Sequence, residues 1–423
     1  MATNTDDRRF AELFDVRREA QGMSNVADTD FNPLMNALRE RGPVLKGSLR
    51  ELLGLGGDSR YDTDLPGYTA LSFAACDRAF RENLLFSSEG YNDMPAVRKL
   101  GHVVLNKIGE PHKRMRAAAQ SMFIKPAATG WWRRNWIDDA VKGLVDRLEG
   151  RERADLNIDL CARLPLQVVS LGVGLEGDEA LVFREQLLKS IGNHEATPVE
   201  RAEAAAAVDA TLRGLVLDRR ASPRDDVVSG LAKADFKEVD GTTRKLIDDE
   251  VLGFSRHILL AGGGTTWRQL GITIHALLDA PELWAAARAD RALIYDAIEE
   301  AARWNATGPT FPRLVTEDVE LDGVFIPANS RIDICLGAGN RDPKRWDDPD
   351  RFDPFRKKQA HLGFGMGPHL CIGQHVAREM MAGAINALMD SFPEIRLDRD
   401  APPPRLTGGL EQRGYSSIPV VLA

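Results

Sequence analysis

The sequence predicts a mainly α-helical fold with a small, dispersed β component. Segment 248–278 is long and mostly apolar, and segment 197–220 is rich in alanine, so both favour helix strongly. Strand patterns are short and few. The chain has 423 residues and is 43% hydrophobic, which is enough to bury a large core without disulfides. We therefore expect one domain over residues 1–423, in which residues 1–29 form a loosely ordered N-terminal segment.

Local signals mark the ends of the expected helices. Thr197, Pro198 and Glu200 combine a capping hydroxyl, a proline for the first turn and a capping-box acid. Pro281 follows the long apolar helix, and segment 281–304 then predicts one or two further helices. Segment 374–392 predicts another helix, which lies between a glycine and a proline.

Three short segments predict the β component. Segment 319–334 alternates apolar and polar residues around Asp322-Gly323, a pair that is typical of a hairpin turn. Segments 68–73 and 417–422 are the other two candidates for strands. Because these segments are far apart in the chain, they predict a small sheet component beside a helical body.

Charge and cysteine usage exclude several classes of function. With 55 basic and 63 acidic residues the net charge is −8, which disfavours nucleic acid as a partner. The four cysteines are far apart and form no C-x-x-C pair, so zinc ribbons and thioredoxin-type motifs are excluded and a disulfide framework is not expected. The polar N-terminus has no signal-peptide pattern, and no apolar run is long enough for a membrane span, so we expect a cytoplasmic protein without a membrane partner.

A run of glycines interrupts the long apolar helix. Ala261-Gly262-Gly263-Gly264-Thr265-Thr266 lies near its middle, where each glycine costs about 1 kcal/mol relative to alanine. One interpretation is a packing groove or a kink. The other is that a flat or small group approaches the backbone here. The run is not a phosphate loop, because no G-x-x-x-x-G-K-[ST] pattern is present.

One cysteine stands directly before the last long helix. A glycine- and proline-rich loop over residues 364–373 delivers Cys371 to the N-terminal end of segment 374–392. Free backbone N–H groups and the helix dipole favour a thiolate at such a place. A lone cysteine is more commonly a small buried apolar residue, so the spacing around it has to decide.

That spacing resembles the haem-binding loop of the cytochrome P-450 family, F-x-x-G-x-x-x-C-x-G. The positions that match are Phe364, Gly367, Cys371 and Gly373. The resemblance implies the family's fold, in which a long helix crosses over haem b, and it implies that Cys371 is the axial ligand of the haem iron. It also implies that Phe364, Gly367 and Gly373 bind the cofactor.

Four further side chains resemble the family's contacts to the haem propionates. His112 and Arg116 lie in segment 111–116, which is similar to the family's C helix, and Arg313 and His369 match two other propionate-binding positions. Cations and hydrogen-bond donors beside carboxylates are physically sensible. The alternative for His112 and Arg116 is a basic, solvated helix face.

A second set of residues resembles a structural cluster of the same family. Glu300 and Arg303 share a helix face at i, i+3 and are similar to the family's E-x-x-R pair. Arg351 lies in a segment similar to the one whose arginine joins that pair. The resemblance implies a buried cluster that supports the haem loop. A solvated ion pair is the alternative.

The glycine run resembles the family's oxygen-binding turn, A-G-x-[DE]-T, with one departure. Gly262 and Thr265 match, but Gly264 replaces the expected acid. The resemblance implies catalytic roles for Gly262, the position of Gly264 and Thr265, where the acid and the threonine hydroxyl guide protons. Because Gly264 cannot carry a proton, a water or Gln269 one turn on is the expected substitute.

The resemblance implies a monooxygenase that inserts one oxygen atom from O2 into a C–H bond of a small organic substrate, by hydroxylation or oxidative O-demethylation. The short stretch after Cys371 has no room for a fused reductase, so we expect electrons from a separate ferredoxin and ferredoxin reductase, or an equivalent flavoprotein. Alternatives are a peroxide-driven peroxygenase and a haem-thiolate protein that only binds ligands.

The substrate pocket is expected by position on several segments. Its candidate lining residues are Val97, Ile258, Ala261, Pro309, Phe311 and Leu410. These side chains are mainly apolar and favour a terpenoid or a small aromatic. Polar groups that face inward would instead favour a polar ether, such as a methylated sugar or a methoxylated acid.

Overall fold

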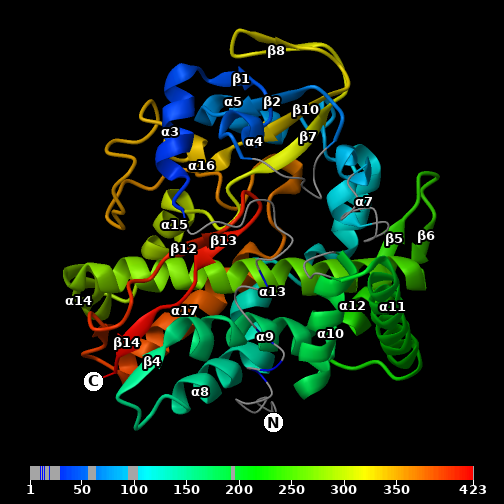
Figure 1. Cartoon of the computed structure of the whole chain (residues 1–423). Helices are drawn as coiled ribbons and strands as arrows, with labels where there is room; N and C mark the ends of the chain where they lie inside the picture. Colours follow the sequence, from blue (N-terminus) through cyan, green and yellow to red (C-terminus); the bar gives the residue numbers. More distant parts are fainter. Residues whose placement is uncertain are drawn as a thin grey trace.

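The structure is a computed structural model that describes residues 10, 12, 14, 19, 29–55, 63–93, 103–191 and 196–422. Most of this part of the chain is helical and its strands are short, so the predicted mainly α-helical fold is confirmed. Figure 1 shows the long helix α13 (Asp248–Asp279) crossing the molecule, with a strand-rich part on one side and helices on the other.

The remaining helices follow the strong sequence signals, with several shorter ones between them. In chain order they are α3 (Asn32–Arg41), α4 (Leu49–Leu52), α5 (Phe73–Arg81), α7 (Gly109–Gln120), α8 (Asp138–Asp146), α9 (Arg163–Val173), α10 (Gly177–Ile191), α11 (Pro198–Ala221), α12 (Val227–Lys233), α14 (Pro281–Ala289), α15 (Leu293–Trp304), α16 (Leu336–Gly339) and α17 (Gln374–Ser391). Two π-helical stretches, Ala127–Ile137 and Asn157–Cys161, precede α8 and α9.

The largest sheet lies in the strand-rich part and has the order β1-β2-β10-β7-β3. Its strands are β1 (Val44–Lys46), β2 (Gly67–Ala70), β3 (Phe86–Ser87), β7 (Phe311–Val315) and β10 (Ser330–Ile334). β10 runs parallel to β2 and antiparallel to β7. The sheet therefore places Arg313 of β7 opposite Ile332 of β10, on a strand in which Pro312 and Val315 are also buried.

Small sheets account for the other strands. They are the hairpins β5–β6 (Asp235–Lys237 and Thr243–Lys245), β8–β9 (Val319–Leu321 and Val324–Ile326) and β12–β13 (Leu406–Gly408 and Arg413–Tyr415), and a three-stranded sheet of β4 (Arg153–Asp155), β11 (Arg396–Leu397) and β14 (Pro419–Val421). The predicted turn at Asp322-Gly323 joins β8 to β9, and both of its residues have positive φ, 47° and 82°. This is the backbone that a type I′ hairpin turn requires.

The three predicted strand segments are confirmed at β2, at β8 to β10 and at β14. The predicted helix boundaries agree with α11, α13 and α17 within one or two residues. Segment 281–304 forms two helices, α14 and α15, which adjoin across a short turn. The strands that sequence reasoning missed have two to five residues, too few for a clear alternation.

Helix α13 continues through its three glycines. Their missing side chains let other helices pack closely, since a Cβ on Gly262 would lie 3.1 Å from Val169 of α9 and one on Gly263 would lie 3.2 Å from Leu166. A packing groove is therefore part of the explanation for this run. The burial gained against α9 offsets the low helix propensity of glycine.

The predicted loosely ordered segment 1–29 lies mostly outside the described residues. Three of its described residues, Phe10, Phe14 and Glu19, are buried. Phe10 and Phe14 belong to the largest apolar core cluster, where the Phe14 ring packs edge-on against Trp267 of α13. This part of the N-terminal segment is thus attached to the middle of the molecule.

Within the residues described, no one helix is both long and apolar enough to cross a bilayer, whereas one bent pair, Asn157–Val173 with Gly177–Ile191, passes that test by length and composition alone.

Helix α11 begins with the capping box that its sequence predicts. The hydroxyl of Thr197 accepts the Glu200 N–H, while the Glu200 carboxylate accepts the Thr197 N–H at 2.7 Å. We expect Thr197→Ala to lower the free energy of unfolding by about 1 kcal/mol, because it removes one half of this capping box. Thr197→Ser keeps the hydroxyl and serves as the control in denaturant titrations. Equal stability of the alanine and serine variants would contradict the assignment.

Candidate haem site

The loop before α17 is shaped by glycine at position 367. Gly367 has φ +66°, and a Cβ there would lie 2.9 Å from the Phe80 carbonyl oxygen and from the Arg81 Cα. A larger residue would be strained and would push the loop away from α5. The loop closes with a hydrogen bond from the Cys371 N–H to the Phe364 carbonyl at 2.9 Å. These constraints fix where the thiol emerges.

The Cys371 thiol is accessible, although burial of its surroundings raises the pKa of the thiol. Backbone N–H groups of Gly373 and Gln374 and the charge of Arg116 act in the opposite direction and favour the thiolate. A thiol that is accessible and yet surrounded by protein faces an internal recess. A Cβ on Gly373, two residues further on, would meet no atom within 4 Å, so there is open space beside this glycine as well.

Helix α13 has an open strip in its glycine-rich middle. Ala261 is exposed, and Ile258 and Thr265 are half-buried, whereas Gly264 next to Thr265 is buried. The Thr265 hydroxyl donates to the Ala261 carbonyl oxygen at 2.8 Å, one turn back. An exposed residue in the middle of a helix that is otherwise buried indicates a hollow beside it, so one side of α13 is free to receive a ligand.

The predicted propionate contacts converge in the structure. The rings of His112 and His369 are 4.2 Å apart between centroids, and Arg116 donates to the Pro368 carbonyl at 3.2 Å. Arg313, on β7, is 4% exposed and reaches Tyr91 OH at 3.4 Å. Three separate elements, α7, the cysteine loop and β7, thus bring cationic and hydrogen-bonding groups together.

This cluster has the character of an anion site. His112 Nε2 and Arg313 Nε are buried with no hydrogen-bond partner, and such a donor costs about 1–3 kcal/mol. Burial lowers the pKa of His112 to about 4, and burial with the nearby Arg313 charge lowers that of His369 to about 2. No carboxylate among the described residues hydrogen-bonds to this cluster. The carboxylates of a haem would satisfy these donors, so the residues present fit the group.

The structural cluster around Glu300 forms, but with a different third arginine. Glu300 accepts two hydrogen bonds from Arg303 at 2.7 Å, and both side chains are buried. Arg356 completes the cluster with its Nε 3.2 Å from Glu300. Arg351, the residue expected there, has a side chain that is 66% exposed and pairs with Asp353, so this expectation was wrong. Its backbone carbonyl still accepts from Arg303 at 3.1 Å.

The turn after Arg351 explains why this arginine points away from Glu300. Asp353 donates its N–H to Glu300 at 3.0 Å, which brings residues 353–356 against α15 and turns Arg351 outward. The sequence offers several arginines in this stretch, and spacing alone does not select one of them. The solvated ion pair considered as the alternative for Glu300 and Arg303 is excluded by their burial.

A second network, which sequence reasoning missed, ties α15 to the cysteine loop. Glu299 pairs with Arg378 of α17 at 2.5 Å and with His361 at 3.1 Å. Burial acts to raise the pKa of Glu299, but the hydrogen bonds from Arg378 and His361 outweigh it and hold that pKa at about 2. The Arg378 guanidinium also lies 4.2 Å from the Phe364 ring centroid. Phe364 is thereby fixed at the start of the loop.

The candidate pocket residues separate into groups. Ile258 and Ala261 lie on the open strip of α13, and Phe311 is half-buried at the start of β7. Pro309 is buried where a Cβ on Gly337 would meet it at 3.2 Å, and Leu410 packs in a small apolar cluster with Phe31 and Met35. Val97 lies outside the described residues.

Two other members of the site, Ser88 and Tyr91, gave no signal in the sequence. Ser88 Oγ lies 3.2 Å from His369 Nε2, and Tyr91 contacts Arg313. Gln269, the expected substitute for the missing acid, accepts the Thr307 N–H at 3.1 Å, while its Nε2 has no partner. These contacts depend on how distant segments pack, which a linear pattern does not encode.

Comparisons with known proteins agree with this geometry. The family model described as Cytochrome P-450 matches residues 196–413. Cytochrome P-450 105C1 of a Streptomyces species is 30% identical over 403 residues, which cover 94% of this chain and 97% of that protein. The mycinamicin IV hydroxylase/epoxidase of Micromonospora griseorubida is 33% identical over 281 residues, or 66% of this chain and 70% of its own.

A solved structure shows the same architecture. The structure of a mutant of cytochrome P-450 EryK in complex with erythromycin B aligns with a TM-score of 0.76 at 27% identity. The alignment covers 93% of this chain and 96% of that one.

The different positions of Arg356 and Arg351 predict different effects of their removal on the free energy of unfolding. Arg356→Ala should destabilise the protein by about 3 kcal/mol or more, because it removes one partner from a buried charged cluster. Arg351→Ala removes an exposed side chain and should change the free energy of unfolding by less than about 0.5 kcal/mol. Denaturant titration of the two variants checks this. An equal or reversed order would contradict the placement of Arg356.

The anion cluster yields a prediction on cofactor retention. His112→Ala combined with Arg313→Ala should accelerate loss of haem to a scavenging apoprotein by roughly 10-fold or more, because two donors to the propionates are lost. Arg114→Ala, which changes a neighbouring cation on α7, is the control. The absorbance of the haem band over time gives the rate. Unchanged haem release in the double variant would contradict this role.

Proposed function

Because this chain belongs to the cytochrome P-450 family and is a haem b-dependent monooxygenase, we propose that it hydroxylates an unactivated C–H bond of a largely apolar substrate with electrons from a ferredoxin and its reductase. The observation that carries the proposal is the accessible Cys371 thiol inside the protein, with the anion cluster beside it and an open strip on α13. Each of these three features matches one part of the cofactor: the iron, the propionates and the face that meets substrate.

When bound, haem supplies the activation of O2 and the transfer of one oxygen atom. The chain's own residues hold and orient it. Cys371 is the iron ligand in this proposal, and Gly373 leaves space against the loop. His112, Arg116, Arg313 and His369 bind the two propionates, with Ser88 and Tyr91 orienting His369 and Arg313.

Thr265 is the residue proposed to position a proton donor. Its hydroxyl hydrogen is engaged with the Ala261 carbonyl, so its oxygen keeps lone pairs that can accept a hydrogen bond from a water on the open side. The water in this proposal lies at Thr265, one turn of helix from the exposed Ala261. Gly262 and Gly264 add no side chain that would crowd this place.

The lining of the open side supports an apolar substrate. Ile258, Ala261 and Phe311 present hydrocarbon, and the small size of Ala261 leaves space for a bulky ligand. One relative is named as a mycinamicin IV hydroxylase/epoxidase, and the solved structure of a mutant of another is a complex with erythromycin B. We propose a substrate of this general kind, a bulky natural product with an apolar face. Oxidative O-demethylation is the alternative if that carbon bears an oxygen.

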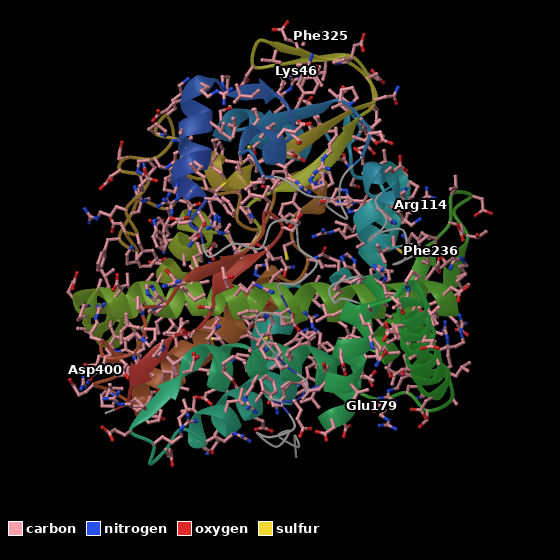
Figure 2. The ribbon with its side chains drawn as sticks, viewed as in Figure 1. Lys46, Arg114, Glu179, Phe236, Phe325 and Asp400 are labelled. Carbon is pink, nitrogen blue, oxygen red and sulfur yellow. The ribbon has the colours of Figure 1, made fainter. Side chains whose placement is uncertain are left out.

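The surface near Cys371 supports docking of an acidic electron donor. Lys113 and Arg114 lie on the outer part of α7, the helix whose Arg116 contacts the cysteine loop, and Figure 2 shows Arg114 at the periphery. A basic area on a chain of net charge −8 favours one orientation of an acidic ferredoxin. Electrons would then enter on the side of the thiol.

A peroxide-driven reaction is the second candidate, favoured by glycine at position 264. Incubation with 18-oxygen gas, NADPH, ferredoxin and ferredoxin reductase separates the two. We first choose a substrate as the compound that shifts the ferric absorbance saturably, from a set of macrolides, terpenoids, aromatic acids and methylated sugars. The proposal predicts one labelled oxygen per product. Product formed with peroxide, but none with the reductase system, would establish the alternative.

The docking surface has its own test. The double variant Lys113→Glu/Arg114→Glu should raise the KM for ferredoxin several-fold and invert its dependence on salt, because attraction, which salt weakens, becomes repulsion, which salt relieves. Lys46→Glu, on β1 at a distant edge of the molecule in Figure 2, is the matched control. Equal KM values in the two variants would place the donor elsewhere.

A further inference from the structure

Gly264 faces two buried guanidinium groups. A Cβ on this glycine would lie 3.2 Å from Arg184 Nη2 and 3.5 Å from Arg268 Nη1. Arg184 comes from α10, and Arg268 lies one turn further along α13. The same Cβ would lie 3.2 Å from Gln412 Oε1, so an acidic side chain at position 264 would be within reach of both cations once it displaced the Gln412 amide. The chain has two arginines around a residue that cannot neutralise them.

Both arginines also hold the backbone of the glycine-rich stretch. Arg184 donates to the Leu259 carbonyl at 3.3 Å, and Arg268 donates to the Gly264 carbonyl at 2.7 Å. These two carbonyls flank Ala261 and Gly262, where α13 is open. The positions of the two guanidinium groups therefore bear directly on the backbone geometry beside Thr265.

Two buried cations this close require a counter-charge. Burial lowers the pKa of Arg268 to about 10, with Glu19 opposing this shift and Arg184 adding to it. Unpaired buried charges cost several kcal/mol each. Gln412, whose Oε1 accepts from Arg268 at 2.8 Å, supplies a dipole but no charge.

Glu19 supplies the carboxylate from the N-terminal segment. This residue is 3% exposed, and its carboxylate accepts from Arg184 with both oxygens, at 2.8 Å to Nη2 and 3.3 Å to Nε. Its backbone carbonyl accepts from Arg268 at 3.3 Å. One residue thus contacts both guanidinium groups. A bidentate pair of this kind fixes direction as well as charge.

The same segment is anchored on α13 by apolar contacts. The Phe14 ring lies 6.1 Å from that of Trp267, the residue before Arg268, and the Arg163 guanidinium of α9 lies 3.9 Å from the Phe10 ring centroid. Phe14 and Glu19 thus contact neighbouring residues of α13, Trp267 and Arg268.

We propose that Glu19 is a positioning residue of the monooxygenase reaction, supplying from the N-terminal segment the carboxylate that position 264 lacks and so holding Arg184 and Arg268 against the backbone beside Thr265. The inference rests on the proposed function for its catalytic consequence. The structural part of the proposal is that a carboxylate at residue 264 can replace the one at residue 19. This part can be tested without measuring product formation.

The experiment moves the carboxylate from one position to the other. The variants are Glu19→Gln, Glu19→Asp, Gly264→Asp and the double variant Glu19→Gln/Gly264→Asp. Glu179→Gln is the matched control, since Glu179 is an exposed glutamate on α10, the helix of Arg184, and lies at the periphery in Figure 2. Each holoenzyme is assayed for haem content, the midpoint of thermal unfolding, and the share of reducing equivalents released as peroxide.

We expect a carboxylate at residue 264 to compensate for the loss of the one at residue 19. Glu19→Gln should lower the thermal midpoint by roughly 5 °C with haem retained, and should raise the peroxide share several-fold. The double variant should recover most of both, and Glu19→Asp, which keeps the charge, should lie between. Glu179→Gln should match the wild type. Recovery by a substitution at residue 264 is not expected of a glutamate that only anchors the segment.

Three results would overturn the proposal. One is a Glu19→Gln variant that matches Glu179→Gln in midpoint and in peroxide share. Another is a loss of stability with an unchanged peroxide share, which would make Glu19 structural only. The third is a double variant without recovery. If the wild type bound haem but formed no product, the proposed function would fail instead, and recovery of the midpoint would then decide whether the carboxylates are interchangeable.

Discussion

The rest of the site depends on how the chain keeps one thiol accessible inside the protein. Cys371 follows a turn that only glycine at position 367 permits, because a Cβ there would collide with α5. Two charged networks then clamp the surroundings: Glu300 holds residues 353–356 against α15, and Glu299 holds Arg378 of α17. Burying such clusters is costly unless every partner is satisfied. Because the charged groups of both networks are paired, the networks can be buried next to the loop and keep it from moving into the recess.

The second constraint is on α13, which meets two demands at its glycine run. On one side Gly262 and Gly263 admit close packing of α9, and on the other the strip with Ala261 and Thr265 stays open. Any branched side chain at 262 would push against Val169, so small residues serve both sides at once. Because position 264 is also a glycine, it has no charge to offer the two arginines, Arg184 and Arg268, that lie next to it. The molecule satisfies them through a segment that begins far away in the chain, which links the N-terminal region to the centre of the site.

The sequence predicted the long helices, the hairpin turn and the cysteine loop, because each is encoded by local chemistry. Caps, interior glycines and a thiol at a helix start are short-range signals. It did not predict the partners that tertiary packing selects. Arg356, and not Arg351, lies beside Glu300, because a turn at residue 353 directs Arg351 outward. The pairing of Glu19 with Arg184 joins residues 165 positions apart, so no local pattern indicates it. Tyr91 and Ser88 were missed for the same reason, since polar residues in a loop carry no periodicity.

The most direct test of this account is X-ray absorption at the iron edge of the purified ferric holoprotein. We expect one sulfur scatterer in the first coordination shell of the iron, retained in Cys76→Ser and lost in Cys371→Ser. Cys76 is a fully buried thiol elsewhere in the fold, so it controls for nonspecific effects of removing a cysteine. Iron with only nitrogen and oxygen neighbours in the wild type, or a sulfur signal that persists in Cys371→Ser, would contradict the assignment on which the site is built.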